Sequence, residues 1–329
     1  MPVNLKGRSL LTLKDFTKDE IYYLLALAKD LKNKKRIGGN QKLLKNKNIV
    51  LIFEKTSTRT RCCFEVASSD EGAEVTFLGV NDSNMAKESI EDTAKVLGRW
   101  YDGIAFRGFK QKTVEDLSKF SGVPVWNALT DDYHPTQVLA DFLTIQENIN
   151  KPLDKINFVF VGDGRNNMAN SLMIGATKLG MNFTILAPKQ LQVGGELLKE
   201  IQDLAKHTGT KITLTENIKD VEGADVVYTD VWVSMGEKVE YKKRYDLLKN
   251  YQVNMEMLKA TNNPDVIFMH CLPSFHDMET QVAQKILKDE GIEMLEVTDE
   301  VFRSKHSVVF NEAENRLHTI KSVMVATIG

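Results

Sequence analysis

The sequence has few cysteines, and none has the spacing that holds a metal or builds a disulfide framework. Its three cysteines are Cys62, Cys63 and Cys271, and no CxxC or HxxxH pairing accompanies them. Cys62 and Cys63 are adjacent, so in a helix they would point about 100° apart. We therefore expect reduced thiols, no metal site and a cytoplasmic location.

Long apolar runs and a strong charge of one sign are also missing. No stretch reaches the roughly 18 apolar residues of a membrane span, and the charged N-terminal residues predict no secretory leader. The 43 basic and 45 acidic residues give a net charge of −2. This balance argues against nucleic acid or a membrane as a partner.

What the chain of 329 residues does contain is enough length for about two domains. Short β-branched runs alternate with segments of helical periodicity, which indicates an α/β fold with parallel sheets covered by helices. The predicted strands are 48–53, 74–79, 103–107, 123–127, 156–162, 182–187, 211–214, 225–230 and 266–270. The predicted helices are 61–72, 88–101, 113–121, 135–150, 166–180, 196–208 and 312–328.

Pro152 marks the expected boundary between the two domains, because the residue before a proline is biased away from helix. The last helix, 312–328, could pack on either domain. In open α/β sheets, ligands bind at the carboxyl ends of the strands. The motifs considered next all lie at such ends.

Residues 57–61, Ser-Thr-Arg-Thr-Arg, lie between a predicted strand and a predicted helix. The start of a helix leaves backbone N–H groups without partners and is electropositive. Hydroxyls and guanidiniums added there are donors of the geometry that a phosphate accepts. Ser57 or Thr58 could be only a helix cap, and Arg59 or Arg61 only a surface charge. Phosphate binding explains all five residues at once, so we prefer it.

Arg107 ends a predicted strand and is expected to face the same crevice as residues 57–61. His134 precedes Pro135, a residue suited to the first position of a helix, so His134 and Gln137 would lie at one helix start. A lone histidine is often only structural. Near Arg107 and Arg59, a catalytic role for His134 is an equal alternative.

The segment 162–167, Gly-Asp-Gly-Arg-Asn-Asn, invites a dinucleotide interpretation. That fingerprint needs a third glycine or alanine at position 167, where this chain has asparagine. A nicotinamide-dependent dehydrogenase is therefore the weaker alternative. Asn167 could instead bind a carboxylate or an amino group of a small ligand.

Three further strand ends carry polar or reactive groups. Asp230 could pair with a ligand ammonium, with Ser234-Met-Gly as a loop that closes over it, or it could be an ordinary strand end. Cys271 follows His270 and could be inert packing or could contact substrate. Arg316 could supply one more guanidinium.

Together these motifs resemble the carbamoyltransferases, almost from end to end. Residues 57–61 are similar to that family's carbamoyl-phosphate loop, and His134-Pro-Thr-Gln137 to its second signature. The His270-Cys-Leu-Pro and Ser234-Met-Gly motifs resemble the ornithine branch and not the aspartate branch. The putrescine enzymes also lack Ser-Met-Gly, which argues against putrescine as the acceptor.

The resemblance implies two Rossmann-like domains joined by interdomain helices. Residues 1–150 would bind carbamoyl phosphate, residues 151–312 ornithine, and the helix at 313–329 would return to the first domain. It also implies a homotrimer, in some members a dodecamer, with active sites at subunit interfaces. The family's interface loop commonly carries glutamine where this chain has Ser83, which puts a cross-subunit contact through that residue in doubt.

The resemblance further implies a reaction without cofactor, in which the δ-amine of L-ornithine attacks carbamoyl phosphate to give L-citrulline and phosphate. It assigns carbamoyl phosphate to Ser57, Thr58, Arg59, Thr60, Arg107, His134, Gln137, Cys271, Leu272 and Arg316. It assigns ornithine to Asn167, Asp230, Ser234 and Met235, and catalysis to Arg107, His134, Cys271 and Asp230. The residues leave open whether the protein serves arginine biosynthesis or the arginine deiminase pathway.

Overall fold

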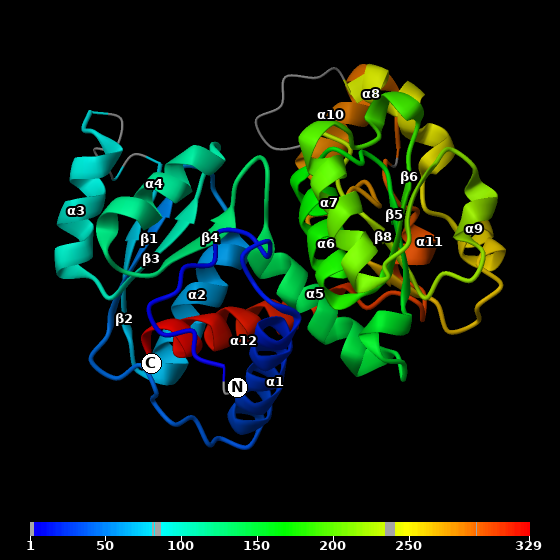
Figure 1. Ribbon diagram of the computed structural model, residues 1–329. Helices are drawn as coiled ribbons and strands as arrows, with labels where there is room; N and C mark the ends of the chain where they lie inside the picture. Colours follow the sequence, from blue (N-terminus) through cyan, green and yellow to red (C-terminus); the bar gives the residue numbers. More distant parts are fainter. Residues whose placement is uncertain (1–2, 81, 83–86, 234–240, 294) are drawn as a thin grey trace. The chain divides into compact units, whose positions relative to one another are not determined.

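The computed structural model of the chain describes residues 3–80, 82, 87–233, 241–293 and 295–329. It divides into two compact units, residues 1–143 with 313–329, and residues 144–312 (Figure 1). Among the described residues, no helix is both long and apolar enough to cross a membrane.

The first unit contains a four-stranded parallel sheet in the order β2-β1-β3-β4. Its strands are β1 (Asn48–Phe53), β2 (Glu74–Leu78), β3 (Gly103–Arg107) and β4 (Val125–Leu129). Its helices are α1 (Lys18–Arg36), α2 (Thr58–Glu71), α3 (Ile90–Trp100) and α4 (Gln111–Ser121), with most of α5 (Pro135–Asn148) and α12 (Val309–Ile328).

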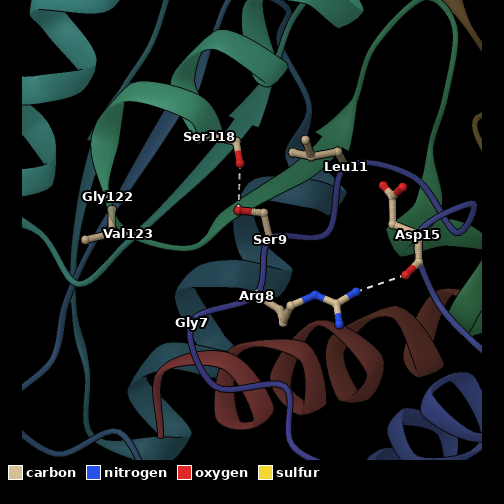
Figure 2. Close-up of a pocket in the computed structure, with 8 residues that line it drawn as sticks. All are labelled: Gly7, Arg8, Ser9, Leu11, Asp15, Ser118, Gly122 and Val123. Atoms are coloured by element: carbon tan, nitrogen blue, oxygen red, sulfur yellow. Dashed lines mark hydrogen bonds between the residues drawn. The ribbon is translucent and has the colours of Figure 1, made fainter.

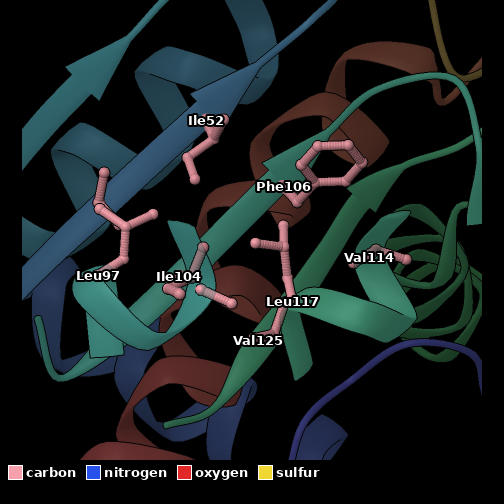
Figure 3. Close-up of a cluster of buried hydrophobic side chains, with 9 residues drawn as sticks. Ile52, Leu97, Ile104, Phe106, Val114, Leu117 and Val125 are labelled. Atoms are coloured by element: carbon pink, nitrogen blue, oxygen red, sulfur yellow. The ribbon is translucent and has the colours of Figure 1, made fainter. Parts of the chain in front are cut away.

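Both faces of this sheet are covered by helices, as Figure 1 shows. On one face, Ile52 and Phe106 from the strands pack with Leu97 of α3 and Leu117 of α4 in a buried cluster (Figure 3). On the other face, Trp126 of β4 stacks on Phe64 of α2 and donates to Thr327 of α12. Burial of apolar area at roughly 25 cal/mol per Å² drives this arrangement.

The second unit contains a five-stranded parallel sheet in the order β7-β6-β5-β8-β9. Its strands are β5 (Asn157–Val161), β6 (Asn182–Leu186), β7 (Ile212–Thr215), β8 (Val226–Thr229) and β9 (Ile267–Met269). Its helices are α6 (Asn167–Leu179), α7 (Gly195–Thr208), α8 (Tyr241–Leu248), α9 (Met255–Ala260), α10 (Gln281–Glu290) and α11 (Asp299–Phe302). Short 3₁₀ turns are η1 (Leu153–Lys155), η2 (Lys189–Leu191), η3 (Ile218–Val221) and η4 (Lys249–Tyr251).

A row of aromatic rings crosses the middle of the second sheet. Phe158 stacks on Phe183 at 5.3 Å and on Tyr228 at 5.8 Å between ring centroids. The parallel register pairs Phe158 with Phe183 directly, so residues of equal parity from adjacent strands share one face. The rings fill the centre of the unit and leave the strand ends for polar groups.

The α/β fold with two parallel sheets is confirmed, and the predicted strand at 48–53 is β1 residue for residue. Most other predicted bounds differ from the observed ones by one to three residues, and two of these differences have a clear local reason. The predicted strand 123–127 lies at 125–129 instead, because Pro124 has no N–H to donate to the ladder. The predicted helix 61–72 already begins at Thr58, because Ser57 caps it.

Several helices were not predicted at all, namely α1 and α8 to α11. The first had a readable signal, since Thr17 and Glu20 form a reciprocal capping box at the start of α1. Helices α9 and α11 span six and four residues, too short for apolar periodicity to reveal them.

Candidate active site

The first turn of α2 is organised by Ser57, which has extended backbone (φ −165°, ψ 112°) and is the N-cap. Its hydroxyl oxygen accepts from the Thr60 N–H at 3.2 Å and its O–H donates to Thr60 Oγ1 at 3.0 Å. Arg59 lies in this same turn, half-buried. The cap fixes the electropositive start of the helix, where an anion is stabilised.

Arg316 reaches this helix start from α12, 256 residues further along the chain. Its Nη2 donates to Thr60 Oγ1 at 3.0 Å, and its side chain is buried. Within the described residues, its Nε is also buried and has no hydrogen-bond partner. Buried donors are nearly always paired, so this N–H is available to a bound ligand.

Arg107 is the last residue of β3, next to β1, and is buried. Its carbonyl accepts from the Glu54 N–H at 2.8 Å, which holds the two strand exits together. Gly108 follows, and a Cβ there would lie 2.3 Å from Glu54 Oε2 and 2.3 Å from Phe106. Only glycine fits this turn, so the residue after Arg107 is fixed by close packing.

His134 precedes the first residue of α5 and is buried. Burial lowers its pKa well below the usual 6.5, and the positive charges of Arg316 and Arg107 lower it further. The imidazole is therefore neutral at neutral pH. Thr136 Oγ1 lies 3.3 Å from its Nδ1.

Gln137 lies in the first turn of α5, as expected, and is fully buried. Its backbone N–H donates to the His134 carbonyl at 3.1 Å, and its Nε2 donates to Asp141 Oδ1 at 2.8 Å. The second bond fixes the orientation of the amide. The structure thus groups Ser57, Thr60 and Arg316 at the start of α2. Arg316 and Arg107 also act on His134 at the start of α5.

Arg61 does not join them, contrary to our expectation for residues 57–61. Its Nε donates to Glu65 at 2.8 Å and its guanidinium lies 3.8 Å from the centre of the Phe77 ring. Arg61 is exposed, and its contacts are those of an ordinary surface residue. The difference follows from the helix, which turns Arg61 about 200° away from Arg59.

In the second unit, Asp230 follows β8 and collects three donors. Its Oδ1 accepts from the Cys271 thiol at 3.2 Å and from the Val231 N–H at 2.8 Å. Its Oδ2 accepts from Asn166 Nδ2 at 3.3 Å. Burial raises the pKa of Asp230, and these hydrogen bonds act against that rise.

The turn at Cys271 and Leu272 is built on His270, which is fully buried. The Leu272 N–H donates to His270 Nδ1 at 2.9 Å, and Leu272 has a positive φ of 57°. Because Nδ1 accepts, the ring proton is on Nε2, which faces Glu296 Oε1 at 3.2 Å. The His270 N–H in turn donates to Glu312 Oε2 at 3.0 Å.

Sequence reasoning missed Glu296 and Glu312, since they are 26 and 42 residues from His270. It also chose Asn167, the first residue of α6, and overlooked its neighbour. Asn166 is the N-cap of α6, donates to Asp230, and accepts from the Ala169 N–H at 2.8 Å. Asparagine before an apolar helical run was the available signal. The predicted Ser83, Ser234 and Met235 lie outside the described residues.

Two clusters in the described ranges have the composition of metal sites. Asp230, His270 and Cys271 offer ligand atoms within 4.8 Å of one another, but both nitrogens of His270 already face protein partners. The other cluster is His276, Asp277 and Asp299. His276 lies 2.7 Å from Asp299, and Arg303 forms ion pairs with both Asp277 and Asp299. Neither arrangement calls for a cation.

An open cavity of about 440 Å³ lies between the N-terminal segment and the end of α4 (Figure 2). Arg8 lines it, but its guanidinium is engaged by Glu20 at 3.1 Å and by the Asp15 carbonyl at 2.9 Å. None of the predicted site residues lines this cavity. The cavity is therefore separate from the candidate site.

Comparison with known proteins agrees with this geometry. The carbamoyl-P binding domain of aspartate/ornithine carbamoyltransferase matches residues 8–147, and the Asp/Orn binding domain matches residues 154–327. A catabolic ornithine carbamoyltransferase of Clostridium perfringens is 60% identical over 331 residues and covers 100% of both chains. An ornithine carbamoyltransferase of Staphylococcus aureus is 59% identical over 329 residues, 99% of each chain. The solved ornithine carbamoyltransferase of Pyrococcus furiosus has a TM-score of 0.90 at 40% identity, and covers 100% of this chain and 99% of that one.

The fold and the matched domains are those of an α/β group transferase. The chain belongs to the aspartate/ornithine carbamoyltransferase family. The resemblance seen in the motifs is thereby confirmed, and a nicotinamide-dependent dehydrogenase is not favoured.

His134 should remain neutral over the pH range in which an exposed histidine gains a proton. Nitrogen-15 NMR of the imidazole should show no protonation between about pH 7 and pH 6, the range of an ordinary histidine. In Arg316→Ala, the loss of one nearby positive charge should raise the pKa of His134. Protonation near the ordinary pKa in the parent, or no rise in the variant, would contradict the electrostatics described here.

Proposed function

We propose that this protein transfers the carbamoyl group between carbamoyl phosphate and the δ-amine of L-ornithine, giving L-citrulline and phosphate. The observation that carries the proposal is the meeting of Arg316 with the capped start of α2, near a histidine that burial, together with two guanidiniums, keeps neutral. Membership of the family supports the reaction class, and the high identity to ornithine carbamoyltransferases supports the acceptor.

The phosphate group is held by the start of α2 and by Arg107. Ser57, Thr58, Arg59 and Thr60 supply hydroxyl, guanidinium and backbone donors around one end of the helix dipole. Several charge-assisted hydrogen bonds to one dianion fix its position as well as its charge. Positioning of this kind can supply roughly 7–11 kcal/mol of the barrier reduction.

The carbonyl oxygen of the substrate gains negative charge as the amine adds. Thr60, Arg107, His134 and Arg316 surround that oxygen in the proposal. The neutral His134 donates to that oxygen from one ring nitrogen in this proposal, and its Nδ1 lies 3.3 Å from the Thr136 hydroxyl. One such donor is typically worth about 2.7–4 kcal/mol. Gln137 and the carbonyls of Cys271 and Leu272 accept from the carbamoyl NH₂.

The amine must lose a proton before it can attack, since an alkyl ammonium has a pKa of about 10.4. Asp230 Oδ1 already lies 3.2 Å from the Cys271 sulfur, and in the proposal the same carboxylate accepts a hydrogen bond from the δ-amine. This hydrogen bond directs the nitrogen lone pair toward the carbonyl carbon. Asn167, Ser234 and Met235 bind the α-amino and carboxylate end of ornithine.

The bonds of the reaction balance without a cofactor. A C–N bond forms between the δ-nitrogen and the carbonyl carbon, and the C–O bond to phosphate breaks. Phosphate leaves with the electron pair of that bond, and one N–H proton is lost as the urea group of citrulline forms. The same residues serve the reverse reaction, in which phosphate attacks citrulline, as in a catabolic enzyme.

We further propose that the protein works as a homotrimer in the cytoplasm, with dodecamers as a higher assembly. Val96 and Trp100, one turn apart on α3, are 42% and 68% exposed, and exposed apolar residues of this size suit a subunit contact. All three cysteines are free, which suits a reducing compartment.

The choice of acceptor is tested by a colorimetric assay for carbamoylated product. With carbamoyl phosphate, the purified protein should form product with L-ornithine, and at least about a hundredfold less with putrescine, L-aspartate or N-acetylornithine. Putrescine has no α-amino acid end and N-acetylornithine has its α-amino group blocked, so each leaves binding groups unpaired. L-Aspartate has no δ-amine to attack. Equal rates with putrescine would refute the proposed acceptor.

Arg59→Ala should abolish carbamoyl-phosphate binding measurable by calorimetry, because it removes a guanidinium from the start of α2. Arg61→Ala is the matched control, since that residue is exposed and paired with Glu65. It should bind carbamoyl phosphate within about twofold of the parent. Unchanged affinity in Arg59→Ala, with the fold intact by circular dichroism, would remove Arg59 from the phosphate site.

Cys271→Ala should lower turnover and alter the KM for ornithine, because Asp230 loses the hydrogen bond from its thiol. Cys62→Ala is the control, since Cys62 is exposed on α2. Steady-state kinetics with both substrates measures the effect. If Cys271→Ala and Cys62→Ala both match the parent, Cys271 is only packing.

A further inference from the structure

Helix α12 contacts α2 at both ends of that shorter helix. At the first turn, Arg316 donates to Thr60. At the last turn, Lys321 donates to Asp70 Oδ2 at 2.7 Å and lies 3.5 Å from Glu71 Oε1. The side chain of Lys321 is fully buried. A second contact group with a charge therefore lies about 7.5 Å along α12 from Arg316.

A buried ammonium is costly unless its partners are well placed. Burial disfavours the charged form of Asp70, but hydrogen bonds from Lys321 and Lys35 outweigh it and lower its pKa. Glu71 is held in turn by the Leu43 N–H at 3.2 Å. The carboxylates at the end of α2 are thus also held from outside α12, by Lys35 and by the Leu43 N–H.

Lys32 of α1 adds a third fixed point. It is buried and donates to Asn315 Oδ1 at 2.7 Å. Asn315 is the residue immediately before Arg316. The helix segment that carries Arg316 is therefore held on one side by Lys32 and on the other by Lys321.

These contacts matter because Arg316 itself is lightly held. Its Nη2 bond to Thr60 is a single hydrogen bond, and its Nε has no partner among the described residues. The position of the guanidinium therefore follows the position of α12. Misplacement of a catalytic group by about 1 Å can cost up to about a hundredfold in rate.

We infer that Lys321, through its ion pair with Asp70, is a positioning residue that holds Arg316 beside Thr60 for the transfer reaction. The inference rests on the proposed function of Arg316 at the carbamoyl group. Lys321 touches no substrate. Lys321 affects catalysis by setting the position of α12 along α2, and thereby the position of Arg316.

The test is a double-mutant cycle of Lys321→Met with Arg316→Ala. Lys321→Met keeps the length of the side chain and removes its charge, and should lower kcat/KM for carbamoyl phosphate about tenfold. In the Arg316→Ala background, the same change should have less than about a twofold effect. Lys321→Arg should restore part of the loss.

Lys35→Met is the matched control. Lys35 pairs with the same Asp70 carboxylate at 2.5 Å, but it comes from α1 and its side chain is 32% exposed. It should change kcat/KM by less than about twofold in both backgrounds. If Lys321→Met does not fold, Asp70→Asn weakens the same pair with little change of shape and should show the same pattern.

Equal losses from Lys321→Met in both backgrounds, or no loss in the parent background, would overturn the positioning role. Calorimetric affinity for inorganic phosphate, measured in the same four proteins, gives a readout that does not depend on turnover. It should show the same non-additive pattern. If the unmutated protein binds phosphate but carbamoylates no amine, the proposed function is contradicted. The double-mutant cycle measured by phosphate affinity then decides the positioning role by itself.

Discussion

Positive charge gathered at the start of α2 is the constraint on which the first unit depends. Arg59 belongs to that helix, Arg107 ends a central strand, and Arg316 comes from the last helix of the chain. Like charges repel more strongly when they are withdrawn from water, so only rigid elements can hold them together. A bound dianion would relieve this repulsion and stabilise the folded state. Burial lowers the pKa of His134, and the charges of Arg316 and Arg107 lower it further.

The second unit has the opposite electrostatic character. Asp230, Glu296 and Glu312 are buried around His270, and together they shape the turn that carries Cys271. Burial of carboxylates is as costly as burial of guanidiniums, and here backbone N–H groups and an imidazole offset it. One unit thus suits an anion and the other an amine. This division matches a reaction between an acyl phosphate and an amino acid that bears an amine.

The sequence revealed the parts of this arrangement that depend on neighbours along the chain. The run 48–53 and the cap at Ser57 are local patterns, and both were readable. Asn166, the N-cap of α6 that donates to Asp230, was not among the predicted residues, because its partner lies 64 residues away. The pairing of Lys321 with Asp70 spans 251 residues, and no local pattern predicts it. Sequence patterns could not predict the partners of the buried charges, because the tertiary fold determines them.

The two half-buried thiols differ in what surrounds them. Cys271 contacts Asp230 Oδ1 at 3.2 Å. Cys63 follows residues 57–61, and burial raises its pKa although the charges of Arg316 and Arg59 oppose the rise. Since the thiolate and not the thiol is the strong nucleophile, a raised pKa makes the Cys63 sulfur a weaker competitor of the amine for an acyl phosphate. Burial, and not the neighbouring guanidiniums, therefore protects this sulfur.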